Sequence, residues 1–312
     1  LLVDLLYREH GSYDDDVEAL RRALPDFECE HLKCDVHDSL GSVRRTLAKM
    51  LSSRYTRIVF LSAKVSQLAF LLPLGFVHRA YAIYHFMPNT RADLHARLLP
   101  VLARAFRLAT YSEAVSSMLH DRLGIRLPAL PSRIIDKVES ERRMHAKYAD
   151  GTTFRVLVPG IRPGVRKFLN PLELLSNLER ATGATEIRLF VQSAPIDALT
   201  GHPSIEFVRS GIPKDEYEAL YCSCHLIALE FDCGYELRAS GVILDAAASG
   251  CLVLTTDHQI TRSYGFPNSI VCDISTVGAL IGRAHSGETL QPLIPGAGIE
   301  EFSQRWRTFL SL

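Results

Sequence analysis

The segment LRASGVILDAAASG, residues 237–250, contains residue types that could hold a phosphate and a ribose. Ser240 and Gly241 stand where a helix would begin, and the first amides of a helix bind anions with the help of the helix dipole. Arg238 adds a positive charge, and Asp245 follows one turn later, where its carboxylate could accept hydrogen bonds from ribose hydroxyls. An ordinary strand–helix unit explains the alanines but not this alignment, so the segment predicts a nucleotide site.

A second segment, VLVPGIRPGVRKFLNP at residues 156–171, places three cations in a loop that contains glycine and proline. Arg162, Arg166 and Lys167 follow a predicted strand, at the end where parallel sheets bind their ligands. Positive side chains there would neutralise the charge that grows on a departing diphosphate as its bond breaks. A solvated loop would explain this segment taken alone, but two anion-binding loops in one half of the chain favour a shared diphosphate site.

Both segments belong to a regular alternation of predicted strands and helices. In the first half, apolar runs of strand length occupy residues 1–7, 57–63, 79–86 and 108–114, and helical spacing occupies residues 17–24, 42–54, 66–75, 91–106 and 115–124. In the second half, strands are predicted at residues 154–160, 186–192, 204–211, 225–231 and 252–257, and helices at residues 170–183, 213–224, 241–250 and 298–312. This rhythm predicts a parallel sheet with helices on both faces in each half.

An interruption of the alternation sets the expected domains. Pro128, Pro131 and a charged stretch break the pattern, which indicates a junction. We expect an N-terminal Rossmann-like domain at residues 1–135, a linker at 136–152, a second Rossmann-like domain at 153–292, and a C-terminal helix packing back at 293–312. The expected fold class is α/β, with two doubly wound domains facing each other across a cleft.

The composition excludes several classes of protein. A chain of 312 residues that is 47% hydrophobic can bury two domain-sized cores, which excludes a disordered chain. Lys plus Arg and Asp plus Glu both number 35, so there is no overall basic field of the kind that concentrates nucleic acid. We therefore expect no nucleic-acid partner, and any bound anion must be held by local groups.

The cysteines and acidic residues do not indicate a metal site. The seven cysteines are odd in number and lie mostly in apolar runs, which is typical of free thiols in a reducing compartment and predicts a cytoplasmic protein. Cys222, Cys224 and His225 have the spacing of part of a zinc site, but a second ligand pair is missing. The triplet Asp14–Asp16 precedes a helix and is expected to cap it and to complement its dipole.

Residues 154–257 resemble the retaining nucleotide-sugar glycosyltransferases of family 4, which have the GT-B fold of two Rossmann-like domains. The resemblance rests on the order and spacing of three motifs, which are the basic loop at residues 160–167, the segment IEFVRSGIPKDEYEALYCSCHLIAL at 205–229, and SGVILDAAASGCLVL at 240–254. It implies metal-independent transfer of a sugar from a nucleoside diphosphate donor to a glycan or lipid-linked acceptor. The nucleotide-sugar is a substrate, so no cofactor is expected.

The resemblance also implies how the donor diphosphate is bound. Lys167, with Arg162 and Arg166 beside it, lies where the family has diphosphate-binding basic residues. Ser240 and Gly241 fall in the loop whose amides hold the distal phosphate. These five residues would form one binding site for the leaving group.

Other positions are assigned by the same resemblance. Asp245 replaces the glutamate that contacts the ribose, and Gly211 and Ile212 would lie beside the nucleobase. Arg238 is a candidate catalytic residue because of its charge beside the predicted helix start, not because of the resemblance, and it would hold the diphosphate as it leaves. Leu237 occupies the position of the family's other glutamate, which is a departure at the usual contact to the donor sugar.

The first half carries a weaker likeness to the acceptor domain of the same family. YAIYHFMP resembles the strand that ends in a histidine near the donor sugar, which makes His85 the second candidate catalytic residue. A core histidine that is satisfied by its neighbours is the alternative. Gly11 and Ser12 would form the loop after the first strand, facing the acceptor.

Two other functions fit the same architecture. A dinucleotide-dependent oxidoreductase should show G-x-G-x-x-G after its first strand, and neither glycine-containing loop supplies that pattern. A non-catalytic sugar-nucleotide-binding subunit would keep the fold, and Leu237 is the feature that favours it.

Membrane contact is a further expectation for the first half. No stretch reaches the roughly 18 uninterrupted apolar residues that a membrane span needs, and the start LLVDLLYREHG is too charged for a signal peptide. Arg97, Arg104 and Arg107 could contact anionic lipid from one helix, which would give peripheral association with the cytoplasmic face of a membrane. A solvated helix face is the alternative explanation of these arginines.

Overall fold

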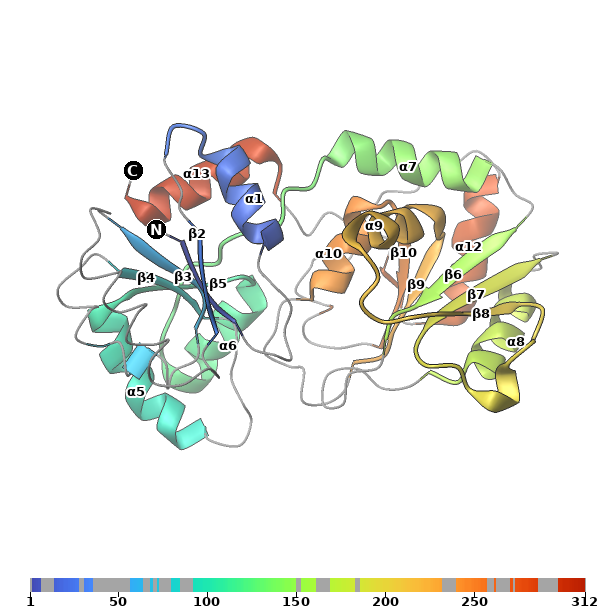
Figure 1. Ribbon diagram of the computed structural model, residues 1–312, viewed down its shortest axis with the longest axis horizontal. Coiled ribbons are helices and arrows are strands. Elements are labelled where there is room, and N and C mark those ends of the chain that lie inside the picture. The colour runs from blue at the N-terminus through green and yellow to red at the C-terminus, as the bar shows by residue number, and fades with distance from the viewer. Residues whose placement is uncertain are drawn as a thin grey trace. The chain divides into compact units, whose positions relative to one another are not determined.

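The computed structural model describes residues 2–6, 14–27, 31–35, 57–63, 68–69, 72, 80–84, 92–149, 153–160, 169–182, 186–231, 240–256, 261, 270–271, 273–285 and 297–311. The chain forms two compact units (Figure 1). The first unit contains Leu1–Ile134 and Ala297–Leu312, and the second contains Ile135–Glu236 and Ser240–Gly296.

The first unit is built on a five-stranded parallel sheet with the order β2-β1-β3-β4-β5. Its strands are β1 (Leu2–Leu6), β2 (His31–Asp35), β3 (Ile58–Ala63), β4 (Ala80–Tyr84) and β5 (Arg107–Thr110). The apolar runs explain this arrangement, because a parallel sheet is covered by helices on both faces and needs buried side chains on both. The expected helix at residues 42–54 lies outside the described residues.

Four described helices of eight or more residues accompany this sheet, which are α1 (Asp14–Ala23), α5 (Ala92–Ala105), α6 (Glu113–Leu123) and α13 (Ile299–Leu310). Neighbouring residues of β3 enter different cores, because successive side chains of a strand point to opposite faces. Phe60 packs in the core formed with α5 and α6, and Leu61 packs in the core formed with α1 and α13.

Helix α13 closes the first unit with an aromatic face. Phe302, Trp306 and Phe309 are buried in the core that α13 shares with α1, β3 and β4. The Trp306 indole donates a hydrogen bond to Pro131 O at 3.1 Å, and the Tyr81 hydroxyl donates to Leu310 O at 3.0 Å. The C-terminal helix therefore packs on the N-terminal half, which its amphipathic pattern alone could not specify.

The second unit contains a six-stranded parallel sheet with the order β11-β10-β9-β6-β7-β8. Its strands are β6 (Phe154–Val158), β7 (Ile187–Gln192), β8 (Ile205–Val208), β9 (Leu226–Ala228), β10 (Leu252–Leu254) and β11 (Ile270–Val271). The expected α/β class, with a parallel sheet in each half, is confirmed. Strand β11 was not predicted from the sequence.

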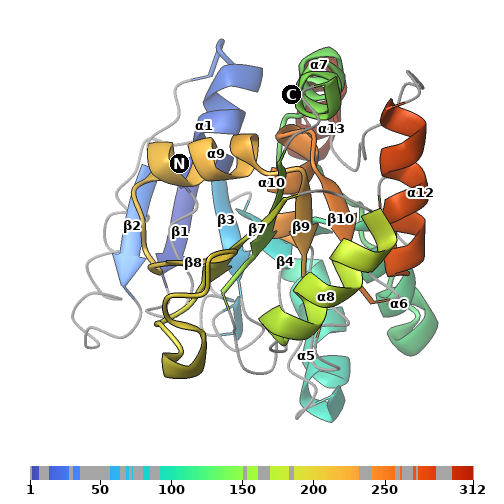
Figure 2. The ribbon, with the colours of Figure 1, turned by 90° about the vertical axis from the view of Figure 1, so that its right-hand side faces the viewer.

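Helices cover both faces of this second sheet (Figures 1 and 2). They are α7 (Lys137–Ala149), α8 (Pro171–Thr182), α9 (Lys214–Ser223), α10 (Gly241–Ala248) and α12 (Ile274–His285), with the 3-10 helix η2 (Asp197–Leu199). Val156 and Val158 face the core formed with α7, α8 and α12, and Leu157 faces the core formed with α9 and α10. Helix α12 was also not predicted.

The segment expected to link the two halves, residues 136–152, contains helix α7 of the second unit. Ser140, Met144 and Tyr148 are buried along one face of α7, at the four-residue spacing that a helix requires. Gly250 allows this close packing, because a Cβ there would lie 2.6 Å from Ser140 O, and its φ of +67° also favours glycine. The charged composition indicated a linker because only one narrow face of α7 is apolar.

Candidate functional site

The carboxyl edge of the second sheet lies beside several described residues that the sequence singled out as a nucleotide site. All the strands are parallel, so the segments that follow them emerge at the same edge. Gly160 follows β6, Gly211 follows β8, and Ser240 stands at the start of α10, after β9. This edge is where an α/β sheet binds ligands.

The N-terminus of α10 has a side-chain cap, and it also has two amides that do not bond to it. Ser240 is 2% exposed, and its Oγ accepts a hydrogen bond from Ile243 N at 3.4 Å. The amides of Gly241 and Val242 have no partner among the described residues. A Cβ at Gly241 would meet nothing within 4 Å, so the space beside this exposed glycine is open to an anion.

Asp245 lies one turn further along α10 and is half-buried. Its Oδ2 accepts a hydrogen bond from the Tyr217 hydroxyl of α9 at 3.0 Å. Burial, and then the neighbouring Tyr221 and Asp245, raise the pKa of Tyr217 far above its ordinary value, so the phenol stays protonated and donates. Tyr217 therefore holds one oxygen of the carboxylate and orients the group.

Sequence reasoning missed Tyr217. The signal available was its spacing from Tyr221 on a predicted helix, since residues four apart share a face. The two rings lie 4.5 Å apart between centroids, which anchors Tyr217 on the α9 face that packs toward α10. Only the pairing of α9 with α10 reveals that its hydroxyl reaches Asp245.

The turns after β6 and β8 have different constraints. Gly160 N donates to Gln192 Oε1 at 3.1 Å, and a Cβ at Gly160 would lie 3.0 Å from Gln192 O, so the turns after β6 and β7 are tightly packed. Gly211 has a φ of +73° and is exposed, and Ile212 beside it is half-buried. These two residues form the turn into α9, the helix that carries Tyr217.

Two threonines at the end of β10 were also missed. Thr255 is 4% exposed and Thr256 is half-buried, and neither side-chain hydroxyl has a hydrogen-bond partner among the described residues. A buried hydroxyl without a partner costs free energy, so such groups are expected to serve a ligand or an ordered water. The sequence LVLTTD gave no reason to separate these threonines from ordinary strand residues.

The remaining predicted site residues lie outside the described residues. They are His85, Arg238, Arg162, Arg166, Lys167, Gly11 and Ser12. Among the predicted positions, the structure thus describes Ser240, Gly241, Asp245, Gly211 and Ile212, all in the second unit.

Cys222, Cys224 and His225 have other roles than a shared metal site. Burial raises the pKa of the Cys224 thiol to about 12, which disfavours the thiolate that a metal needs. His225 Nδ1 accepts from Arg155 N at 3.1 Å, and Nε2 lies 2.9 Å from Lys147 O, so backbone groups occupy both ring nitrogens. In the part of the chain that the structure describes, no group of three His, Cys, Asp or Glu residues could hold a metal ion.

In the first unit, the acidic triplet contributes a buried ion pair. Asp16 is 6% exposed and pairs with Arg133, and the Tyr111 hydroxyl lies 3.1 Å from Asp16 Oδ2 and 3.3 Å from Leu61 O. Asp16 therefore joins α1 to Tyr111, the residue after β5, and to Arg133, in addition to lying in the first turn of a helix.

The arginines expected at a membrane surface differ from one another. Arg97 and Arg104 are exposed on α5. Arg107 is also exposed, but the expectation that it shares this helix is wrong, because it is the first residue of β5. It donates to Ser311 Oγ, just after α13, and lies over the Tyr81 ring. No helix within the described ranges is long and apolar enough to cross a membrane.

Comparison with solved structures identifies the architecture. No protein-family model and no curated protein sequence matches the chain. The Anabaena protein HepE, in complex with UDP and glucose, matches with a TM-score of 0.60 and 12% identity over 99% of each chain. A trehalose-6-phosphate protein from E. coli bound to UDP-2-fluoro glucose matches with a TM-score of 0.60 and 10% identity over 99% of this chain and 98% of the other.

A third match is the UDP-forming α,α-trehalose-phosphate synthase of Burkholderia vietnamiensis, with a TM-score of 0.53 and 11% identity over 99% and 96% of the two chains. The fold of this chain is GT-B. At these identities the likeness concerns the fold, and residue roles rest on the chain's own geometry.

Proposed function

We propose that this GT-B chain is a glycosyltransferase that moves a sugar from a nucleoside diphosphate donor to a glycan or lipid-linked acceptor. The observation that carries the proposal is the start of α10. There, two amides without partners among the described residues precede a carboxylate on the same helix, and Tyr217 orients that carboxylate. The amides of Gly241 and Val242 would bind the diphosphate of the donor, and the carboxylate of Asp245 would accept hydrogen bonds from its ribose.

UDP is the first nucleotide to test, because the similar structures include complexes with UDP, UDP-glucose and a UDP-sugar analogue. In the proposed reaction, the bond between the anomeric carbon and the diphosphate oxygen breaks, and a bond to an acceptor hydroxyl forms. The acceptor proton leaves with the diphosphate. Lys167, Arg166, Arg162 and Arg238 would neutralise the leaving group, and His85 would contact the sugar.

The proposal needs neither a metal nor a resident cofactor, because protein cations would balance the charge of the diphosphate. Retention of the anomeric configuration, a family 4 type of mechanism and a cytoplasmic location remain parts of the proposal. Gly211 and Ile212 would border the nucleobase, and Gly11 and Ser12 would face the acceptor. Peripheral contact with anionic lipid would use Arg97 and Arg104, which are exposed.

A nucleotide panel tests the binding part of the proposal. We expect UDP and UDP-sugars to raise the melting temperature, because a ligand at about 100 times its Kd adds roughly 2.7 kcal/mol of stability. Asp245→Asn should weaken UDP binding by about tenfold, as expected for the loss of a charge-assisted hydrogen bond. Glu206→Gln, an exposed carboxylate on β8, is the matched control. Equal affinity of the two variants for UDP would show that Asp245 does not contact the nucleotide.

A turnover assay tests the catalytic part. Incubation with UDP-sugars should release free UDP through transfer or hydrolysis, and Lys167→Ala should slow this release. NMR of the product's anomeric proton would report retention. The competing function, a non-catalytic sugar-nucleotide-binding subunit, is favoured by Leu237 at the position of the family's glutamate. Tight UDP-sugar binding with no UDP release would support that alternative.

A further inference from the structure

A polar pocket lies at the edge of the second sheet opposite to the candidate donor site. It has a volume of about 360 Å³ and is lined by Arg142, Arg143, Ala146, Lys147, Thr153, Arg155, Cys222, Ser223 and His225. Thr153 and His225 immediately precede β6 and β9, and Ser223 ends α9, so the pocket is at the amino edge of the strands. The candidate donor site is at the carboxyl edge, so the two sites are separate.

The pocket is strongly basic. Four of its lining residues are cations, and no carboxylate lines it among the described residues. The nearby carboxylate of Glu139 receives bidentate hydrogen bonds from Arg142 and one from Arg143, and these lower the pKa of Glu139 to about 2. Because the whole chain has balanced charge, this concentration of cations is a local feature.

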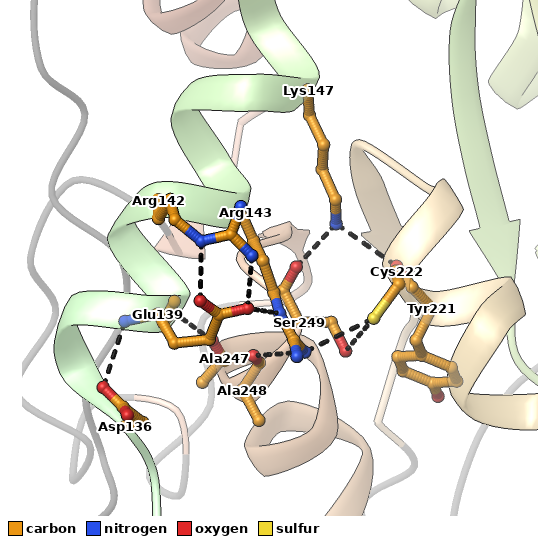
Figure 3. Close-up of polar contacts among 11 residues, drawn as sticks. Asp136, Glu139, Arg142, Arg143, Lys147, Tyr221, Cys222, Ala247, Ala248 and Ser249 are labelled. Carbon is orange, nitrogen blue, oxygen red and sulfur yellow. Dashed lines mark hydrogen bonds and ion pairs between the residues drawn. The ribbon is translucent and has the colours of Figure 1, made fainter. Parts of the chain in front are cut away.

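Helix capping explains two of the four cations (Figure 3). Lys147 Nζ donates to Ser249 O at 2.7 Å and to Tyr221 O at 3.3 Å, and Arg143 Nη1 lies 3.4 Å from Ala248 O. These carbonyls end α9 and α10, where cations satisfy acceptors that have no partner inside the helix. Arg143 and Lys147 are therefore needed by the fold whether or not a ligand binds.

Helix capping does not account for Arg155, and the ion pair with Glu139 accounts for only part of the donor capacity of Arg142. The Arg155 side chain is exposed on β6 and makes no ion pair or hydrogen bond with another described residue. Glu186, the residue before β7, is hydrogen-bonded to Arg188 and Thr153, and Arg155 acts on it through its charge alone. Arg142 donates hydrogen bonds from Nε and Nη2 to the carboxylate of Glu139, and its Nη1 group remains as a donor for a ligand.

We propose that this pocket binds a small phosphate-bearing anion, with Arg155 and Arg142 as its main ligands. Phosphate oxygens match the planar donor groups of arginine, and the charge of a phosphate would offset the positive field of four neighbouring cations. The volume is in the range of small-molecule sites, which favours a phosphorylated metabolite over a polymer. His225 does not bind the anion, because backbone groups occupy both of its ring nitrogens.

Cys222 provides a local reporter for this site. Its thiol lines the pocket, is partly exposed, and lies 3.4 Å from Arg143 Nη1, whereas Cys224 and Cys251 are buried. An anion seated among the arginines should therefore protect Cys222 from alkylation. Nucleotide bound at the other edge of the sheet should leave the rate unchanged, so a failure here and a failure of the proposed function give different results.

The experiment measures iodoacetamide labelling of Cys222 by fragment-ion mass spectrometry, with inorganic pyrophosphate as the probe. We expect pyrophosphate to slow labelling at least threefold, and Arg155→Gln to raise the concentration needed for half-protection about tenfold. Arg180→Gln removes the same charge from an exposed position on α8 and should not change that concentration. Circular dichroism would confirm that both variants are folded.

Two outcomes would overturn the proposal. One is labelling that pyrophosphate does not affect, and the other is equal protection in Arg155→Gln and Arg180→Gln. Vesicles containing phosphatidic acid distinguish the source of the phosphate. Protection by soluble pyrophosphate alone would assign a free metabolite, and additional co-sedimentation with these vesicles that Arg155→Gln abolishes would assign a lipid headgroup.

Discussion

At the scale of single residues, the hydrogen bond between Tyr217 and Asp245 is the most informative contact of the candidate donor site. It holds one carboxylate oxygen of Asp245 and thereby orients the carboxylate. Burial raises the pKa of Tyr217 far above its ordinary value, so its phenol stays protonated and donates to Asp245. Tyr217 is thus a positioning residue for the proposed ribose contact.

Tyr217→Phe should weaken UDP binding about fivefold, since a typical hydrogen bond contributes about 1 kcal/mol. The ring would still pack against Tyr221, so the fold should be kept. Calorimetric titration with UDP measures the effect. Tyr148→Phe is a suitable control. Tyr148 lies on another helix, α7, and the substitution removes a hydroxyl that donates to His225 O. A Tyr217→Phe protein that binds UDP normally would contradict the positioning role.

Thr255→Val should stabilise the unliganded protein by about 1 kcal/mol, because it removes a buried hydroxyl that has no partner among the described residues. If the hydroxyl serves the donor, the same variant should show a smaller rise in melting temperature on adding UDP. Urea denaturation and thermal shift measure the two effects. Destabilisation without ligand would mean that the hydroxyl is already satisfied.

At this scale, local spacing predicted the cap and the carboxylate of α10 but not their partners. Ser240 and Asp245 could be placed because a helix start and one helical turn are sequence-local features. Tyr217 and Thr255 could not, since their significance depends on which helix and which strand end lie beside α10. No sequence pattern within one element contains that information.

At the scale of elements, α7 is the helix that holds the second unit together at the amino edge of its sheet. Its buried face packs against α10 and α12, and its cations reach the last carbonyls of α9 and α10. Composition favoured a linker there because most of α7 is charged. The four-residue spacing of Ser140, Met144 and Tyr148 was the available signal for a helix, and the prediction of a linker missed it.

Lys147→Met should destabilise the second unit by about 1–2 kcal/mol, because it removes one donor from two helix C-termini. Denaturation by urea, followed by circular dichroism at 222 nm, measures the change. Lys137→Met is the matched control, since Lys137 is exposed in the first turn of α7, where a cation is unfavourable. Equal stability of the two variants would show that the caps are dispensable.

At the scale of the whole molecule, the two units differ in how the chain builds them. The second unit is formed largely by residues 135–296. The first unit combines the residues before that range with the residues after it. The β-bridge between Ile134 and Ala297 marks where the chain leaves and re-enters the first unit. The parallel architecture of each half could be predicted from alternating apolar runs. The position of α13 could not, because an amphipathic pattern shows that a helix has a buried face but not which surface covers it.

Truncation after residue 296 should unfold the first unit and leave the second folded. Each large apolar side chain of α13 contributes about 1.5–3 kcal/mol by burial, and the buried ones are Phe302, Trp306, Phe309 and Leu310. Their sum is comparable with the total stability of a domain, about 5–15 kcal/mol. Hydrogen exchange by mass spectrometry would show the loss. Protected amides in β3 and β4 of the truncated chain would contradict this expectation.

The late position of α13 also affects how the protein is made. A ribosome that adds about 5–20 residues per second needs roughly 8–30 s to synthesise residues 135–296. During that interval the second unit can fold, while the face of the first sheet that receives Trp306 stays uncovered. The part of this chain that is synthesised first is therefore the part that matures last, and nascent chains should depend on chaperones until α13 emerges.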